Sequence, residues 1–174
     1  MIDRLRIVAL GGATAAAAAL PLILVAPAQA YDDPAAHAPS QCQNAARIIC
    51  VDKSDEKLFL FEAGQAVMTL DVRFGAEDTP TRNGSFKIYN KEAKHVSRLA
   101  GSEMPYSMFF SGGEAIHYSA DFAKNGYNNS SLGCVNTRDL ASTKKLFDTA
   151  RIGDEVYVYG VLTTYSSYDP HNYD

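Results

Sequence analysis

The segment from residue 68 to residue 74 alternates strictly between apolar and polar side chains. Its apolar members are Met68, Leu70, Val72 and Phe74. Its polar members are Thr69, Asp71 and Arg73. A period of two is the repeat of a β-strand, whose successive side chains point to opposite faces. The segment therefore predicts a sheet with one face on a hydrophobic core and the other in water.

Other short apolar runs, separated by turn residues, extend this prediction to the whole domain. The β-like runs are residues 48–51, 58–61, 85–89, 106–110, 114–117 and 156–159. One helix is expected to begin near Asn136 or Thr137, either of which can cap it, with Leu140 and Phe147 on its apolar stripe. We expect a mainly β sandwich or sheet domain with a single helix packed on it.

The first thirty residues are predicted to be an export signal. Arg4 and Arg6 precede an apolar stretch that ends in Ala28-Gln29-Ala30, the small-x-small pattern that signal peptidases cut. A retained membrane anchor is the alternative, but glycines and prolines interrupt the stretch and no basic cluster follows it. We expect cleavage after Ala30, no membrane span in the mature chain, and a secreted or periplasmic bacterial protein.

The chain beyond the signal contains three cysteines. Oxidising conditions outside the cytoplasm favour a disulfide between Cys42 and Cys50, with two free thiols as the alternative. Cys134 is then left over, and an odd cysteine in an exported chain is either an intermolecular link or a reactive thiol. Residues 31–45 are predicted to be a flexible lead-in, and residues 161–174 a polar tail.

Composition and motifs argue against several classes of function. A formal net charge of −4 disfavours nucleic-acid binding by charge alone. No CxxC or HxxxH spacing supplies a metal site, and no glycine-rich phosphate loop follows a predicted strand. We expect neither a metal nor an organic cofactor.

Cys134 and His117 are the candidates for catalysis. The predicted helix start lies two or three residues after Cys134, so free backbone N–H groups and the helix dipole are expected to lower the pKa of its thiol and to bind an oxyanion. Gly133 allows a substrate to approach the backbone closely. His117 ends a β-run and is the best candidate for the base. The alternatives are a small core cysteine and a hydrogen-bonded structural histidine.

The arrangement of these residues resembles a known active-site signature. Ile116-His117, a polar loop and then Ser131-Leu132-Gly133-Cys134-Val135-Asn136 are similar to the signature of the L,D-transpeptidases, the YkuD-type catalytic domain. Residues 79–86, 104–106 and 151–156 also resemble stretches of that family. The similarity spans residues 46–160, which we expect to be the catalytic domain.

The resemblance implies a reaction on peptidoglycan. A cysteine thiolate, in a groove under a mobile hairpin, attacks a tetrapeptide stem, D-alanine leaves, and an amine on a second stem resolves the thioester into a 3→3 cross-link. Donor and acceptor stem peptides would be the partners, and carbapenems would acylate Cys134. Water in place of the amine would give an L,D-carboxypeptidase. A domain that binds peptidoglycan without turnover is the third hypothesis.

The resemblance also assigns roles to residues. Cys134 matches the nucleophile, and His117 matches a base whose second nitrogen is held by the carbonyl of Tyr118. Gly133 and the Cys134 N–H match the oxyanion site. The remaining matched positions are Tyr106, which would line that site, and Ser131 and Asn136, which would shape the loop. Leu132 departs from the family pattern, which usually has a histidine there that contacts substrate.

Overall fold

The computed structural model describes residues 33–162. The predicted signal peptide and nearly all of the predicted polar tail lie outside the described residues. Within residues 33–162, no helix has the length and apolar character needed to cross a membrane.

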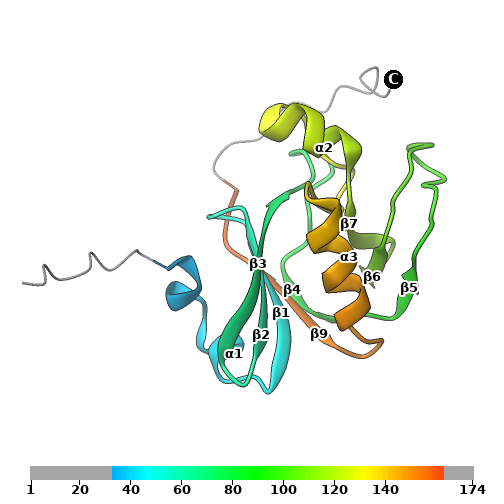
Figure 1. The fold of residues 1–174 in the computed structure, drawn as a ribbon. Helices are drawn as coiled ribbons and strands as arrows, with labels where there is room; N and C mark the ends of the chain where they lie inside the picture. Colours follow the sequence, from blue (N-terminus) through cyan, green and yellow to red (C-terminus); the bar gives the residue numbers. More distant parts are fainter. Residues whose placement is uncertain (1–32, 163–174) are drawn as a thin grey trace, which may run out of the picture. The chain divides into compact units, whose positions relative to one another are not determined.

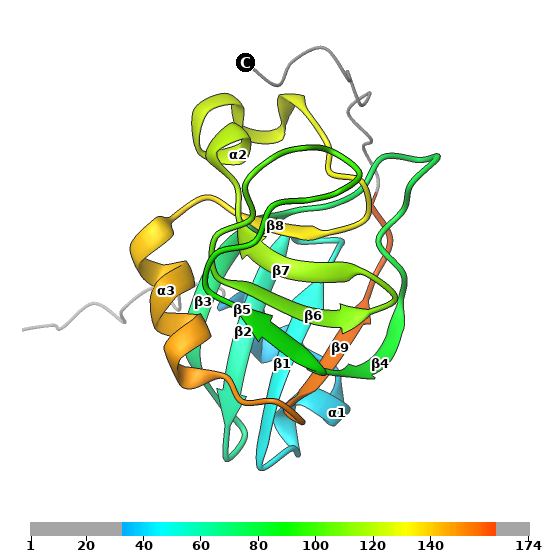
Figure 2. The same ribbon diagram turned by 90° about the vertical axis from the view of Figure 1, so that its right-hand side faces the viewer.

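One nine-stranded sheet forms the body of the domain. Its strands are β1 (Arg47–Asp52), β2 (Lys57–Glu62), β3 (Gln65–Arg73), β4 (Gly84–Lys87), β5 (Asn90–Glu92), β6 (Ser107–Ser111), β7 (Glu114–Tyr118), β8 (Val135–Thr137) and β9 (Glu155–Tyr159). Their order is β4-β9-β1-β2-β3-β8-β7-β6-β5. The β1–β9 and β7–β8 pairs are parallel and the others are antiparallel. The sheet curls into a half-barrel (Figures 1 and 2), which confirms the mainly β prediction.

The alternating segment lies in β3 and the residue that follows it. Leu70, Val72 and Phe74 are buried, as the period of two predicts. Arg73 is the exception, because it stands on the polar face but is only 4% exposed. A charged side chain is rarely buried to this degree unless it is paired. Arg73 therefore requires partners, and these belong to the site described below.

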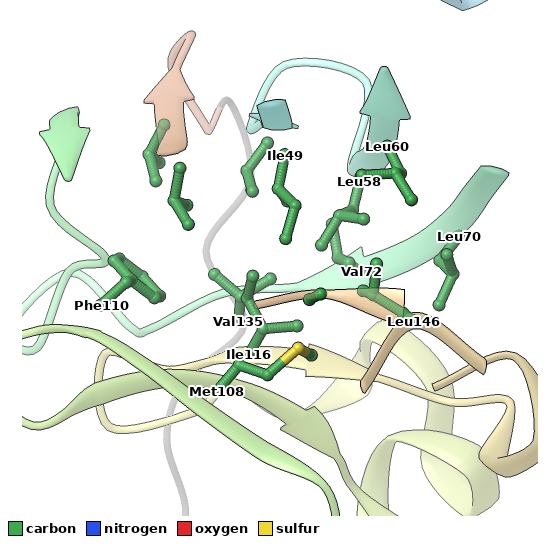
Figure 3. Close-up of a cluster of buried hydrophobic side chains, with 14 of the residues drawn as sticks. Ile49, Leu58, Leu60, Leu70, Val72, Met108, Phe110, Ile116, Val135 and Leu146 are labelled. Atoms are coloured by element: carbon green, nitrogen blue, oxygen red, sulfur yellow. The ribbon is translucent and has the colours of Figure 1, made fainter. Parts of the chain in front are cut away.

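The main hydrophobic core lies between the two halves of the curled sheet (Figure 3). Ile49 and Leu58 approach from β1 and β2, and Ile116 and Val135 from β7 and β8. Leu146, which is fully buried, closes one side of this cluster from the C-terminal helix. Each such side chain contributes about 1.5–3 kcal/mol when it leaves water. This packing holds the two halves of the sheet in a fixed relation.

The helices are short, and the C-terminal one begins later than the sequence predicted. They are η1 (Pro34–His37), α1 (Ser40–Gln43), α2 (Ala120–Asn125), η2 (Gly126–Asn128) and α3 (Leu140–Thr149). The predicted start of α3 near Asn136 or Thr137 was wrong, because both residues pair within β8. The helix begins at Leu140, after Asp139, whose side chain accepts a hydrogen bond from the backbone N–H of Ser142.

The helix α2 was not expected at all. It has six residues, with Ser119 as its N-cap accepting from the N–H of Phe122. Six residues are fewer than two turns, so no apolar periodicity can develop over them.

A disulfide joins Cys42 of α1 to Cys50 of β1, as the sequence predicted. The segment predicted to be a flexible lead-in differs from that expectation, since residues 34–37 form η1 and residues 40–43 form α1. Ala35 and Ala38 are buried there with both cysteines against Phe59 and Phe61, in a second small cluster. The crosslink and these small apolar side chains fix the segment on the sheet.

Candidate active site

The strand register places three polar side chains in one row across the sheet. Asn136 of β8 is the Cα partner of Arg73 in β3 and of His117 in β7. Residues that are directly opposite in neighbouring strands project to the same face. Figure 2 shows β8 between β3 and β7, with α2 beside them. Residues distant in sequence therefore meet on one surface: Arg73, His117 and Asn136.

Hydrogen bonds connect this row. Nδ1 of His117 lies 2.7 Å from the carbonyl oxygen of Tyr118, the contact that the resemblance implied. A carbonyl only accepts, so Nδ1 carries the proton and Nε2 is an unprotonated acceptor. The Nδ2 amide of Asn136 lies 2.9 Å from that Nε2 and donates to it. Burial lowers the pKa of His117 to about 4; the hydrogen bond with Tyr118 opposes this shift, and the charges of His95 and Arg73 add to it. The ring is therefore neutral at pH 7.

Arg73 continues the row on the other side of Asn136. Its guanidinium donates to Oδ1 of Asn136 at 3.2 Å, to Oδ2 of Asp121 at 2.6 Å and to the carbonyl of Gly126 at 2.9 Å. Its Cζ lies 5.1 Å from the centre of the Phe122 ring. Arg73 thus links α2 and the start of η2 to the residues around His117.

Cys134 ends a tight loop that Ser131 shapes. The Ser131 hydroxyl donates to the carbonyl of Cys134 at 2.6 Å and accepts from the N–H of Gly133 at 3.2 Å. Gly133 has φ of 105°, which side chains rarely adopt. Gly75 packs against this loop so closely that a Cβ would lie 2.9 Å from the Gly133 backbone. The loop therefore requires glycine at both positions.

The expected low pKa of the Cys134 thiol was wrong. Burial raises the pKa of Cys134 to about 11, a backbone hydrogen bond with Ala115 opposes the shift, and the carboxylate of Glu114 adds to it. Cys134 also packs against the apolar side chains of Met104 and Phe109. The helix dipole does not act on the thiol, because β8 follows Cys134 and α3 begins only at Leu140. The resting thiol is therefore neutral.

A cleft of about 430 Å³ brings most of these residues together. Its walls include Cys134, His117, Asn136, Ser131, Leu132 and Arg73. The segment from residue 97 to residue 104 and the helix α2 supply other parts of the lining. Charged groups at the cleft are Glu103, Asp121 and Lys124 in addition to Arg73.

Three predicted site residues are absent from the cleft lining: Gly133, Tyr106 and Tyr118. The ring of Tyr106 packs 5.6 Å from that of Phe147 in α3. Tyr118 contributes its carbonyl and not its side chain. Arg73 and Asp121 were not predicted for the site. The strand pattern placed Arg73 on the polar face of β3, and nothing in that pattern marks it as buried.

The residues that the structure describes contain no group of three or more His, Cys, Asp or Glu side chains able to hold a metal ion. The available chemistry is that of a half-buried thiol, a neutral imidazole with a defined tautomer, and a polar network behind that imidazole.

Comparison with known protein families gives one match. Residues 46–158 match the profile of the YkuD family, the L,D-transpeptidase catalytic domain. No curated protein matched the chain.

Solved structures agree with the family match. An L,D-transpeptidase from Stackebrandtia nassauensis is 31% identical with a TM-score of 0.63, over 71% of this chain and 61% of that one. The Ldtfm–avibactam carbamoyl enzyme is 27% identical with a TM-score of 0.55, over 67% and 50%. The L,D-transpeptidase LdtMt1 in complex with imipenem is 24% identical with a TM-score of 0.59, over 66% and 59%. The chain thus spans between half and about three fifths of the length of these proteins.

Proposed function

The chain belongs to the YkuD family of L,D-transpeptidase catalytic domains, and from that premise we propose that it is an exported enzyme that cross-links peptidoglycan stem peptides through Cys134. In this proposal residues 1–30 are the signal peptide, residues 46–160 are the catalytic domain and residues 161–174 are a polar tail. Family members act on the cell wall, which supports a location outside the cytoplasm.

One observation carries the proposal. A cysteine and a neutral histidine whose Nε2 is unprotonated line the same cleft of a domain with this fold. The thiol is also neutral at pH 7, so the two groups are a neutral thiol and a neutral base and not a preformed ion pair. Such a pair favours general-base catalysis, in which the proton moves as the sulfur attacks, an effect typically worth about 10²–10⁴ in rate.

The chemical steps follow from these two groups. The sulfur of Cys134 attacks the carbonyl carbon of the donor stem while Nε2 of His117 accepts the thiol proton. The oxyanion collapses, the C–N bond breaks, and D-alanine leaves with the proton returned by His117. An amine of a second stem then attacks the thioester and gives its proton to His117. The Cys134 sulfur leaves and is reprotonated, which restores both neutral groups.

The first step requires two adjustments within the site. Nε2 of His117 accepts from Asn136 in the resting structure, so this hydrogen bond must yield to the thiol proton. The N–H of Gly133 donates to Ser131 and must turn toward the oxyanion if it is to stabilise it.

Inhibitor binding is a further part of the proposal. One relative forms a carbamoyl enzyme with avibactam, and another has been solved with imipenem. We expect β-lactams of the carbapenem type, and avibactam, to acylate Cys134, since an acylated thiol is the intermediate of the proposed reaction. Leu132 lines the cleft where the family usually has a histidine, so slower acylation than in those relatives is expected.

The test uses the mature protein, residues 31–174, with a disaccharide-tetrapeptide and product identification by mass spectrometry. Cys134→Ala and His117→Gln are the inactive variants, and Lys145→Ala on the exposed face of α3 is the matched control. A cysteine-dependent dimer that lacks one D-alanine supports the transpeptidase. A shortened tripeptide alone reassigns the enzyme as a carboxypeptidase. No product from folded protein, with the disulfide intact, would refute the catalytic assignment and support a binding domain.

A further inference from the structure

Arg73 is the buried charge that the proposed reaction does not use. It is 4% exposed, it comes from a strand that contributes no reacting group, and its guanidinium lines the cleft. Burial of a charge costs free energy unless partners compensate it. Its ion pair with Asp121 provides part of that compensation, but it leaves the contact with Asn136 unexplained.

The network around Arg73 has only one consistent pattern of donors and acceptors. A guanidinium has no acceptor, so the atom of Asn136 that faces Arg73 must be the oxygen. The amide nitrogen of Asn136 is then the atom that faces His117. At the other end, the carbonyl of Tyr118 can only accept, so it fixes the proton of His117 on Nδ1. Nε2 must accept, and the amide of Asn136 is the group that donates to it.

From this network we propose that Arg73 is a positioning residue, which holds Asn136 so that its NH2 group and not its carbonyl faces Nε2 of His117. The inference rests on the proposed function, because it assigns Arg73 to the control of the proposed base. Asp121 in turn holds the guanidinium at 2.6 Å, and Asn125 and Asn129 donate to the other oxygen of that carboxylate at 2.7 and 2.9 Å. The orientation of one amide is thus determined by residues of β3 and α2.

The consequence concerns the protonation of the base. With the NH2 group toward Nε2, an imidazolium would place two N–H donors against each other. With the carbonyl toward Nε2, the imidazolium would gain an acceptor. Arg73 therefore keeps His117 neutral over a wide range of pH. Without Arg73, the amide can turn over and stabilise the charged ring.

Other charged groups near the ring must be separated from this effect. The charged groups that share the cleft with His117 are Arg73 from β3, Glu103 from the segment before β6, and Asp121 and Lys124 from α2. The thiol of Cys134 also lines the cleft, and His95, after β5, acts on the ring through its charge. Arg73 also lowers the pKa of His117 directly through its charge, as does His95. Removal of Arg73 should therefore raise the pKa of His117 in two ways, by loss of its charge and by release of the Asn136 amide. The effect through Asn136 needs its own test.

The experiment is a histidine titration in the free protein, which requires no substrate. Long-range 1H–15N spectra of the labelled mature protein report the tautomer and pKa of each histidine, and His117→Gln assigns the signal. Wild-type His117 should carry its proton on Nδ1 and stay neutral to about pH 4. Arg73→Met should raise the pKa by about one unit or more, a tenfold change in the proton-binding constant. Arg73→Lys should restore the wild-type value.

A double-mutant cycle separates the effect of Arg73 through Asn136 from the direct effect of its charge. Asn136→Ala should raise the pKa of His117, and Arg73→Met should add less than half of its original shift in that background. Lys124→Met removes a positive charge from the same cleft without touching Asn136, and should shift the pKa by a few tenths of a unit at most. If Arg73→Met leaves the carboxylate of Asp121 without its cation and unfolds the domain, Arg73→Met with Asp121→Asn removes both members of the ion pair and should give the same shift.

Two results would overturn the proposal. The first is an unchanged His117 tautomer and pKa in folded Arg73→Met. The second is a full shift that persists in the Asn136→Ala background, which would mean that Arg73 acts by its charge alone. Neither result depends on peptidoglycan turnover, so a failure of the proposed function and a failure of this inference remain distinguishable.

Discussion

The alkylation rate of Cys134 should rise steeply with pH and show no plateau near neutrality. Burial among apolar side chains raises the pKa of this thiol from its ordinary value of 9.0 to about 11. The thiolate is the nucleophile. A pKa raised by about two units reduces the thiolate fraction at pH 7 by about a hundredfold, which corresponds to about 2.7 kcal/mol. A thiolate of higher pKa is intrinsically more nucleophilic, and this difference raises the alkylation rate by about tenfold. The net expectation at pH 7 is a rate about tenfold below that of an exposed cysteine.

The assay follows iodoacetamide addition by intact mass between pH 7 and pH 10. The disulfide removes Cys42 and Cys50 from the reaction, so one addition reports Cys134. The matched control carries Cys134→Ala and Lys145→Cys, which places a thiol at an exposed position of α3. The rate at Cys134 should increase about tenfold per pH unit across the range, whereas the control should level off near its ordinary pKa.

Substitution of a neighbouring charge supplies an independent check. Glu114 adds to the raised pKa of Cys134, so Glu114→Gln should increase the alkylation rate at pH 7 by about threefold. A plateau of the wild-type rate below pH 8, or alkylation at pH 7 faster than the exposed control, would refute the reasoning. Either result would mean that a preformed thiolate exists and that general-base assistance by His117 is not required.

Three further predictions concern stability. Replacing Cys42 and Cys50 by serine should lower the free energy of unfolding by about 2–3 kcal/mol, because the unfolded chain regains the freedom of a short closed loop; urea denaturation measures it. Leu146→Ala should cost about 2–5 kcal/mol in the same assay, since the side chain is fully buried in the main core, and a loss below 1 kcal/mol would contradict that packing. The pKa of His117 is about 4 in the folded protein and 6.5 in its ordinary state, so the unfolded chain binds the proton at higher pH than the folded one. The free energy of unfolding should therefore fall by about 3 kcal/mol as the pH drops from 6.5 to 4. His117→Gln should remove that part of the acid sensitivity, and equal pH slopes in the two proteins would count against a buried neutral ring.

Local patterns were sufficient for the parts of the fold that depend on local physics. The alternation in β3 predicted the faces of Leu70 and Val72 correctly, and the two nearby cysteines predicted the disulfide. Arg73 could not be predicted as buried, because its partner Asp121 comes from a helix far along the chain. Six residues gave that helix no detectable periodicity.

The prediction for Cys134 failed for a related reason. Asn136 and Thr137 are good helix caps, so local propensity indicated a helix start directly after the cysteine. In the structure both residues complete a three-residue strand between β3 and β7, a pairing that only the tertiary fold can specify. The error carried over to the chemistry, because a strand offers the thiol no dipole and the surrounding apolar residues raise its pKa.

The order of the strands has a consequence for association between copies of the protein. Exposed sheet edges are templates on which another chain can add a strand. Here the two edge strands, β4 and β5, are consecutive in the sequence, and only Ile88 and Tyr89 separate them. Ile88 donates to the carbonyl of Asp154 and Tyr89 to that of Phe109, so the linker itself is hydrogen-bonded to both sides of the sheet. The edges are four and three residues long and meet at one seam, which leaves a second copy little backbone on which to nucleate aggregation.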